Sequence, residues 1–422
     1  MQIGVYGSGY LGTIISGCLA DFGTPVTCFD EDTARINILA QGTVPYYERN
    51  LKEIIRRNVR AGRLIYSTDI ESFARRTQVI FLAHDGNSYL EDLALKVAPL
   101  MPRDGILVLV TPAPVGTAHK LERRLQEAQC TATLVSQPVF LTDGCAVEDF
   151  NWPDRILLGT SSGQAVLTLK QIYRPLVMRG VPVIVTSHET AELVREASTA
   201  FVATKISFIN ELTTLCERVN ADAVDLALAL GLDKKIAPRC LQPGAGFGGP
   251  FAEIQMESLS QLATGNGVTL KILNAAREVN RSLSDCITDK ISRAVQSVQG
   301  KELGVLGLAF KPNTNSVAGS ASILLVRNLT SKGAQVRAYD PVAMPDAMRE
   351  LEDSVKFCDN AYAVAESADA LVVGTGWPEF RALDFDRIRR LLKRPVIVDT
   401  KNLLDSDRLR SMGFQYVGMG RA

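Results

Sequence analysis

The chain has 422 residues, of which 46% are hydrophobic, 22% charged and 6% aromatic. This composition is typical of a folded globular protein of about two to three domains and excludes a largely disordered chain. Lys plus Arg and Asp plus Glu each number 46, so the net charge is zero. A general nucleic-acid-binding protein needs a basic excess, so we expect no nucleic-acid partner. No apolar run is long enough to span a membrane and no signal peptide is evident, so we expect a cytoplasmic protein without a membrane partner.

The cysteines show neither a metal-binding spacing nor a regular disulfide framework. They are scattered along the whole chain, at Cys18, Cys28, Cys130, Cys145, Cys216, Cys240, Cys286 and Cys358. We therefore expect reduced thiols, as in a cytosolic protein, and no metal site.

The first 187 residues alternate short apolar runs with helical patterns. The expected strands are residues 2–6, 25–29, 78–82, 105–110, 133–136 and 155–159. Alternation of this kind predicts a parallel sheet with helices on both faces, and we assign residues 1–187 to one such domain.

From residue 188 the hydrophobic period changes to that of a helix. Apolar or small residues recur every three or four positions from Leu193 to Val219, which predicts one helix of about 30 residues. A second long pattern covers residues 269–299. The apolar stripes are too long for one small domain to cover, so residues 188–300 are predicted to form a central helical domain that pairs two copies of the chain into a homodimer.

From residue 301 the strand and helix alternation returns. The expected strands are residues 303–306, 335–339, 370–374, 395–399 and 415–418. The predicted fold class is therefore α/β, with two doubly wound Rossmann-like domains, residues 1–187 and 301–422, joined by long central helices.

A glycine-rich turn follows the first strand and opens a helix. Gly7 suits the tight turn, Gly9 lets a pyrophosphate approach the backbone, and Gly12 lets the helix pack on the strand. The second strand ends at Asp30, where an acid suits the ribose hydroxyls of NAD and repels the extra phosphate of NADP. Arg35 weakens the argument against NADP slightly. This spacing predicts NAD as the cofactor.

With these elements in place, the chain resembles the UDP-glucose/GDP-mannose dehydrogenase family over nearly its whole length. The matching segments are GSGYLG, Tyr47-Glu48, PVGT, PVFLTDGCAVEDFNWPDRILLG, AELVREASTAFVATKISFINELTTLCE, PGAGFGG, LGLAFKPNT, AYDP, GWPEF and VDTKNL. The resemblance implies NAD on the N-terminal domain and a nucleotide sugar or related diphosphate under the C-terminal domain and the GFGG loop.

The resemblance also implies the binding residues. Beside the fingerprint glycines and Asp30, the expected cofactor-binding residues are Tyr10, Leu11, Arg35 and Thr111. The expected substrate-binding residues are Lys235, Phe247, Gly248, Gly249, Phe310 and Lys311. Some family contacts to NAD are changed, because the loop beside the cofactor reads Ala83-His84-Asp85-Gly86 and Ala318 stands where an arginine is usual.

The family oxidises C6 of a hexose twice through a cysteine adduct, and its catalytic positions are replaced here. The replacing residues are Phe251 for the cysteine, Gln255 for an aspartate, Arg195 for a lysine, Thr199 for an asparagine, Val139 and Asp143 for glutamates, and Pro112 for a threonine. Phenylalanine is no nucleophile, and an arginine does not exchange protons as a tuned lysine does.

Two replaced positions remain candidates for catalysis. Asp143 is a candidate base, with a surface carboxylate as the alternative. Arg195 is a candidate anion or oxyanion ligand, with a salt bridge on the helix surface as the alternative. Glu253 and Glu257 share a helical face and are expected to be a solvated acidic surface.

Two functions are compatible with this pattern. One is a non-standard NAD-dependent oxidoreductase acting on a nucleotide sugar or related diphosphate. The alternative is a catalytically inactive family member that binds a nucleotide sugar or serves as a partner or regulatory protein.

Overall fold

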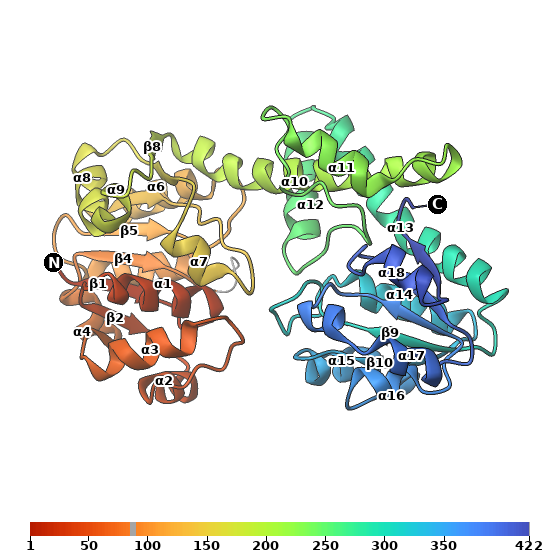
Figure 1. The fold of residues 1–422 in the computed structure, drawn as a ribbon. Helices are drawn as coiled ribbons and strands as arrows, with labels where there is room; N and C mark the ends of the chain where they lie inside the picture. The colour runs from red at the N-terminus through yellow and green to blue at the C-terminus, as the bar shows by residue number, and fades with distance from the viewer. Residues whose placement is uncertain (85–89, 422) are drawn as a thin grey trace. The chain divides into compact units, whose positions relative to one another are not determined.

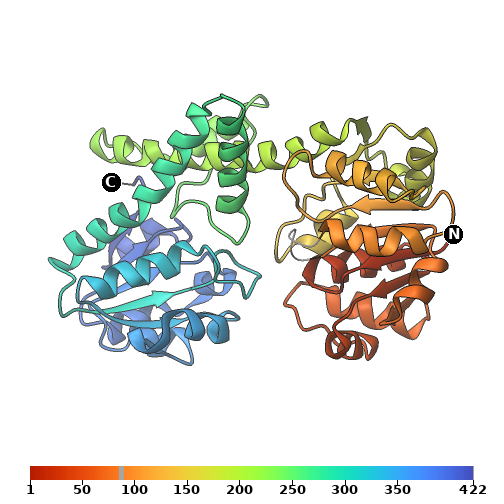
Figure 2. The same ribbon diagram turned by 180° about the vertical axis from the view of Figure 1, so that it is seen from behind.

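The chain, described by a computed structural model over residues 1–84 and 90–421, divides into two compact units. The units are Met1–Ala197 and Ser198–Ala422, and each is built around one sheet (Figures 1 and 2). The division into three domains expected from the sequence stays a prediction. No helix among the described residues is long and apolar enough to cross a membrane.

The first sheet has eight strands in the order β3-β2-β1-β4-β5-β6-β7-β8. Its strands are β1 (Ile3–Tyr6), β2 (Val26–Phe29), β3 (Leu64–Ser67), β4 (Val79–Leu82), β5 (Ile106–Leu109), β6 (Thr133–Ser136), β7 (Ile156–Gly159) and β8 (Val183–Thr186). The strands from β3 to β6 are parallel. β7 meets β6 in the antiparallel sense at one residue pair and is itself parallel to β8.

Helices cover both faces of this sheet (Figures 1 and 2). They are α1 (Tyr10–Asp21), α2 (Thr33–Ala40), α3 (Leu51–Arg60), α4 (Ile70–Arg75), α5 (Leu90–Val97), η1 (Ala98–Leu100), α6 (Thr117–Glu127), α7 (Ala146–Asn151), α8 (Gly163–Ile172) and α9 (Arg174–Val177). One core packs α1, α3, α7 and α8 on the sheet, and a second packs α4, α5 and α6 on its other face. Because both faces are buried, the inner strands are continuous apolar runs.

The second sheet has six strands in the order β11-β10-β9-β12-β13-β14, and they are all parallel. They are β9 (Glu302–Leu306), β10 (Gln335–Tyr339), β11 (Val355–Phe357), β12 (Ala370–Val373), β13 (Val396–Asp399) and β14 (Gln415–Gly418).

The remaining helices begin with α10, which starts in the first unit and ends in the second. They are α10 (His188–Arg218), α11 (Ala223–Leu232), α12 (Ala252–Gly265), α13 (Lys271–Val295), α14 (Ala321–Ser331), α15 (Met344–Leu351), η2 (Glu352–Ser354), α16 (Ala361–Ala365), η3 (Pro378–Ala382), α17 (Phe385–Leu391) and α18 (Ser406–Ser411). One core packs α13, α14 and α15 on the second sheet, and another packs α16, α17 and α18 on the opposite face.

The expected strands lie within one residue of the observed ones, but β3, β8 and β11 were not predicted. All three are edge strands, and each contains exposed or half-buried residues. An edge strand lacks the continuous apolar run that marks an inner strand of a parallel sheet, which explains why the sequence pattern missed them.

We expect Gly12→Ala to destabilise the first unit by about 1 to 3 kcal/mol, the usual cost of forcing atoms into a packed site. A Cβ on Gly12 would lie 1.9 Å from the carbonyl oxygen of Gly7. The matched control is Gly163→Ala, because a Cβ at this first residue of α8 meets no atom within 4 Å. Denaturant unfolding should show the loss for Gly12→Ala and no loss for Gly163→Ala, whereas equal stabilities would contradict the close approach.

Candidate functional site

The glycine-rich turn between β1 and α1 has no room for a side chain at Gly7 or Gly12. Gly7 has a φ of 112°, and a Cβ there would lie 2.5 Å from the carbonyl oxygen of Ala83. Gly9 is the N-cap of α1 and makes no side-chain cap, and the N-terminus of a helix carries the partial positive charge that attracts an anion. The turn therefore fits the pyrophosphate of a dinucleotide. Tyr10 and Leu11, the first two residues of α1, are half-buried beside it.

Asp30 directly follows β2 and holds this turn by hydrogen bonds. Its Oδ2 accepts hydrogen bonds from the backbone N–H of Ser8 at 2.6 Å and from the Ser8 hydroxyl at 2.8 Å. Arg35 lies 3.7 Å from the same oxygen and pairs with Asp32 at 2.9 Å. The acid thus lies beside the turn at the place predicted for a ribose-binding carboxylate, and Arg35 is already engaged by two carboxylates.

A buried carboxylate, Glu48, joins this turn to the loop that carries Asp143. It accepts a hydrogen bond from the Tyr10 hydroxyl and another, at 2.7 Å, from the backbone N–H of Gly144. Burial raises the pKa of Glu48, and the hydrogen bonds oppose that rise. Glu48 was part of the family resemblance, but its role could not be predicted from the sequence because its partners lie 38 and 96 positions away.

Thr111 holds the ends of β4 and β5 together. Its hydroxyl oxygen accepts the backbone N–H of His84 at 2.9 Å and lies 3.0 Å from the carbonyl oxygens of Leu82 and His84. The side chain is therefore used within the protein, and its predicted contact with the cofactor stays a prediction. Asp85 and Gly86 of the same loop lie outside the described residues.

Arg195 lies on the second turn of α10, with its guanidinium buried. Its Nη1 donates to the carbonyl oxygen of Val139 at 2.7 Å. Burial lowers the pKa of Arg195 to about 10, so the group remains charged at neutral pH. Asp143 lies four residues beyond Val139, and both catalytic candidates therefore belong to the first unit.

One turn before Arg195, Glu192 anchors α10 to the turn before α6. It accepts the backbone N–H groups of Gly116 and Ala118 at 2.6 and 2.9 Å. Because these donors lie at the N-terminus of α6, the carboxylate acts as a cap supplied from another helix.

In the second unit, the GFGG loop lies against the segment that follows β9. A Cβ on Gly249 would lie 2.9 Å from the Phe310 ring, and one on Gly248 would lie 2.2 Å from the carbonyl oxygen of Gly319. Lys311 extends over the Phe310 ring, with its Nζ 5.9 Å from the centroid. The structure thus brings together the predicted substrate residues Phe247, Gly248, Gly249, Phe310 and Lys311.

Among the described residues, Lys235 has no hydrogen bond or ion pair with this loop. It is exposed after α11, and its backbone N–H donates to Asp233 at 2.9 Å. Its predicted contact with a substrate stays a prediction.

The replaced positions around α12 interact with one another. The Thr199 hydroxyl donates to Gln255 Oε1 at 2.6 Å, and Phe251, the N-cap of α12, is 47% exposed.

Glu253 and Glu257 both pair with Arg277, which is 9% exposed. The side chains of Glu253 and Glu257 are 49% and 47% exposed, as expected of a solvated acidic surface, and the structure adds Arg277 of α13 as their shared partner.

Lys401, at the end of β13, faces the glycine-rich segment before the GFGG loop. A Cβ on Gly244 would lie 3.8 Å from Lys401 Cδ. The low-dielectric surroundings lower the pKa of Lys401 to about 8, and the charge of Asp399 opposes that shift. The VDTKNL motif contained this lysine, but only the fold places it beside the loop.

Asp340 directly follows β10, as Asp30 directly follows β2, but both carboxylate oxygens of Asp340 already accept hydrogen bonds within the protein. Oδ2 accepts the backbone N–H groups of Leu308 and Ala309 and the indole N–H of Trp377, and Oδ1 accepts two more N–H groups, those of Val342 and Ala343. With 1% exposure, Asp340 shapes the turn after β9 and does not contact a ligand.

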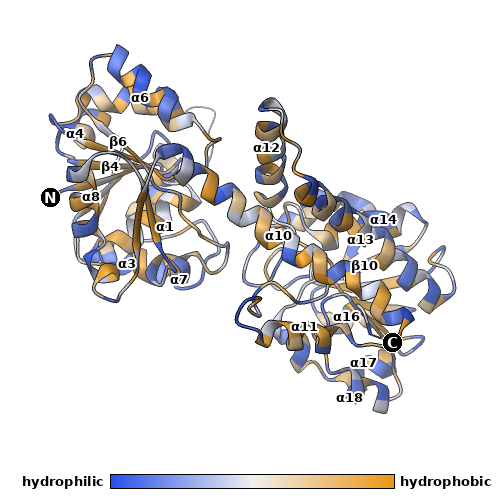
Figure 3. Cartoon of the chain, turned by 90° about the horizontal axis from the view of Figure 1, so that it is seen from above, coloured by the Kyte–Doolittle hydropathy of each residue, from blue (hydrophilic) through white to orange (hydrophobic). Residues whose placement is uncertain are grey.

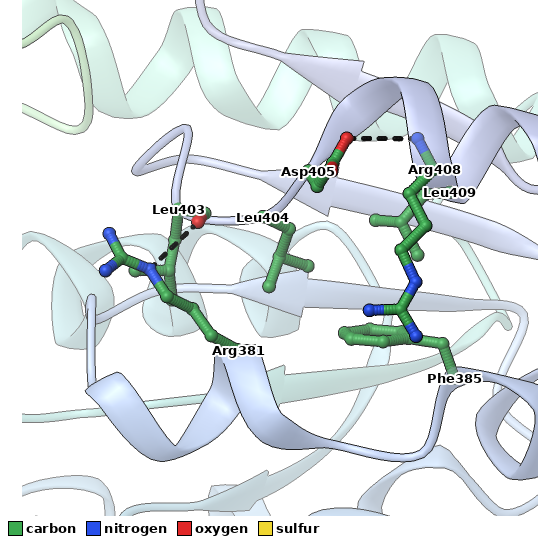
Figure 4. A pocket seen from close by; sticks show the side chains of 7 residues that line it. All are labelled: Arg381, Phe385, Leu403, Leu404, Asp405, Arg408 and Leu409. Carbon is green, nitrogen blue, oxygen red and sulfur yellow. Dashed lines mark hydrogen bonds between the residues drawn. The ribbon is translucent and has the colours of Figure 1, made fainter.

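A surface pocket lies between η3 and the connection from β13 to α18 (Figure 4). It is lined by Arg381, Phe385, Leu403, Leu404, Asp405, Arg408 and Leu409. Asp405 caps α18 by accepting the backbone N–H of Arg408, and Arg381 donates to the carbonyl oxygen of Leu403. None of the residues predicted from the sequence to bind ligands lines this pocket.

Comparison with known families matches three consecutive parts of the chain. Residues 1–177 match the NAD binding domain of the UDP-glucose/GDP-mannose dehydrogenase family, residues 189–282 its central domain, and residues 304–406 its UDP binding domain. These matches confirm the resemblance inferred from the motifs and support NAD as the cofactor.

Individual relatives match over the whole chain. The UDP-glucose 6-dehydrogenase of Rhizobium meliloti (strain 1021) is 36% identical, with 100% of both chains covered. The UDP-glucose 6-dehydrogenase TuaD of Bacillus subtilis (strain 168) is 34% identical, covering 100% of this chain and 93% of the relative. A UDP-glucose dehydrogenase structure from Pyrobaculum islandicum has a TM-score of 0.91 at 30% identity, with 100% of this chain and 98% of that chain covered. The structural likeness confirms the predicted fold class.

If Lys401 contacts a diphosphate, the affinity for UDP-glucose should fall as the pH rises through the pKa of about 8, because the ammonium becomes neutral. Between about pH 7 and about pH 9 the charged fraction, and with it the affinity, should fall about tenfold. Calorimetric titration at several pH values measures the affinity for UDP-glucose. Lys401→Arg is the control, since its guanidinium stays charged and it reports the ligand's own titration. An equal pH dependence in both proteins would exclude a role for Lys401.

Proposed function

Because the chain belongs to the UDP-glucose/GDP-mannose dehydrogenase family, we propose that it is an NAD-dependent oxidoreductase with a non-standard reaction. Its substrate is a nucleotide sugar or related diphosphate, and its reaction is not the four-electron oxidation of UDP-glucose. The observation that carries this proposal is the exposed phenyl ring of Phe251 beside an intact GFGG loop. The loop is shaped for binding, but Phe251, two residues after it, supplies no thiolate to hold an aldehyde.

The residues of each unit have separate parts in this proposal. In the first, the backbone at Gly9 and Tyr10 binds the pyrophosphate, and Asp30 accepts the ribose hydroxyls. When bound, NAD supplies a hydride acceptor. In the second, Lys311 and Lys401 supply positive charge near the GFGG loop for the diphosphate.

The catalytic candidates differ in what they do with a proton. A two-electron oxidation of an alcohol releases one hydride and one proton. Asp143 is the candidate base for the proton, whereas Arg195 stays charged and stabilises an anion.

The second candidate function is an inactive relative that binds a nucleotide sugar or acts as a partner or regulatory protein. One observation favours it. The Thr199 hydroxyl donates to Gln255, so these two replaced positions satisfy each other's hydrogen-bonding groups.

A cytoplasmic location also belongs to the proposal, on the ground that all eight cysteines are free thiols.

Turnover with NAD and a panel of nucleotide sugars tests the proposal. We expect UDP-glucose to yield fewer than two NADH per molecule, with a turnover below about one per second, a low value for an enzyme. Phe251→Cys should not restore the four-electron reaction, because catalytic residues that act as a unit are not additive. The absorbance of NADH measures both reactions.

The outcomes separate the candidates. One NADH per molecule of some sugar nucleotide supports the oxidoreductase. No NADH with any sugar, together with retained UDP binding, supports the inactive relative. Two NADH per UDP-glucose at an ordinary rate would overturn both.

We also propose that the chain forms a homodimer through α10. Phe201, Phe208 and Leu215, spaced by seven residues, are 68%, 52% and 54% exposed. The neighbouring Val219 and, on α11, Leu232 are exposed as well. Figure 3 shows apolar segments in orange along α10. A second copy of the same helix would bury this face by isologous pairing.

Light scattering should give about twice the monomer mass of 45.9 kDa. Phe208→Glu combined with Leu215→Glu should yield monomers, because charges are costly in an apolar interface. Leu167→Glu, which changes an exposed leucine of α8, is the control and should remain a dimer. A monomeric wild type at micromolar concentration would refute the proposal.

A further inference from the structure

The conformation of the GFGG loop depends on one side chain of α13. The Asn280 amide makes two hydrogen bonds with the backbone of Phe247. Its Oδ1 accepts the N–H at 2.9 Å, and its Nδ2 donates to the carbonyl oxygen at 3.1 Å. A side-chain amide that pairs with both polar groups of one residue replaces the partner that a neighbouring strand would supply.

The residue before Phe247 is adapted to this contact. Gly246 has a φ of 89°, and a Cβ there would lie 2.2 Å from Asn280 Oδ1 and 2.9 Å from a methyl group of Leu283. Only a glycine permits both the backbone conformation and the close approach of the amide. The loop and α13 are therefore in direct contact at this point.

The other side of the loop is held by backbone and ring contacts. Gly248 lies against the carbonyl oxygen of Gly319, which accepts the Gly249 N–H at 3.3 Å, and Gly249 lies on the Phe310 ring. These contacts leave Phe247 as the residue whose two backbone groups are held by a side chain.

The helix after the loop is fixed from the same face of α13. Arg277, three residues before Asn280, pairs with Glu253 and Glu257 on α12. The carbonyl oxygen of Ala276 accepts the Ser207 hydroxyl at 2.7 Å, which ties α13 to α10. One turn of α13 thus positions both the loop and the start of α12.

From these contacts we propose that Asn280 is a positioning residue that holds the GFGG loop in its binding conformation before the nucleotide arrives. The inference rests on the proposed function, because it takes a nucleoside diphosphate sugar as the occupant of the loop. A loop ordered in advance does not lose conformational entropy on binding, so the free energy of ordering does not weaken the affinity. Without the amide, Phe247 lacks partners for two backbone groups and the loop adopts other conformations.

The binding test uses UDP as the probe and calorimetry as the readout. Asn280→Leu keeps the size of the side chain and removes both hydrogen bonds. We expect it to raise the Kd for UDP about tenfold while the Kd for NAD stays unchanged. Asn274→Leu, at an exposed position of the same helix, is the matched control and should bind UDP as the wild type does. An unchanged Kd for UDP in Asn280→Leu would overturn the proposal.

Asn280→Asp is the second variant, in case the leucine variant folds poorly. It keeps an acceptor for the Phe247 N–H and loses the donor to the carbonyl oxygen. We expect its Kd for UDP to rise at least about threefold, as for the loss of one neutral hydrogen bond. A loss of NAD affinity in Asn280→Leu would show that this variant is misfolded, and the test then rests on Asn280→Asp. If Asn280→Asp binds UDP with the wild-type Kd, the proposal is overturned.

A second measurement needs no ligand and separates the positioning role of Asn280 from the proposed function. Chymotrypsin cleaves after phenylalanine, so cleavage after Phe247 and Phe251, followed by mass spectrometry, reports opening of the loop. Both Asn280 variants should be cleaved faster than the wild type and Asn274→Leu. If wild type binds no UDP, the proposed function fails, while equal cleavage rates would reject the positioning role itself.

Discussion

A carboxylate at the end of a second strand holds the turn after the first strand in both units. Asp30 accepts the N–H and hydroxyl of Ser8, and Asp340 accepts the N–H groups of Leu308 and Ala309. The two acids differ in what else they contact. Asp340 also accepts the indole N–H of Trp377 and is 1% exposed, whereas the Asp30 side chain is 14% exposed. The same type of interaction therefore leaves the Asp30 carboxylate partly accessible beside the glycine-rich turn, whereas the Asp340 carboxylate of the second unit is buried.

Because Asp340 is buried, the loop proposed to bind the nucleotide in the second unit is formed by other residues. The GFGG loop lies between Asn280 of α13 and the Phe310 and Gly319 region that follows β9. Lys311 and Lys401 bring positive charge from the segments that follow β9 and β13, and burial lowers the pKa of Lys401. Because the carboxyl ends of parallel strands lie at one end of a sheet, residues from distant segments meet there.

The sequence predicted what depends on local pattern. Inner strands are apolar runs, and the spacing from Gly7 to Asp30 follows from one strand–helix–strand unit, so both were found. The edge strands β3, β8 and β11 lack such runs and were missed. Glu48 and Asn280 act on backbone groups 96 and 33 positions away, and only the fold brings these partners together. The two-bond contact of Asn280 leaves no trace in composition or periodicity.

The replaced positions form a consistent set when their partners are considered. Arg195 donates to the carbonyl oxygen of Val139, so the backbone of residue 139 supplies the acceptor although its side chain is a valine. Thr199 and Gln255 share a hydrogen bond between uncharged groups, and Arg277 together with Arg281 pairs with the two glutamates of α12. In the reaction proposed above, a charged guanidinium at residue 195 would stabilise negative charge but accept no proton. The proton of the alcohol in that proposal therefore leaves by another group, and of the two catalytic candidates only the Asp143 carboxylate is a base.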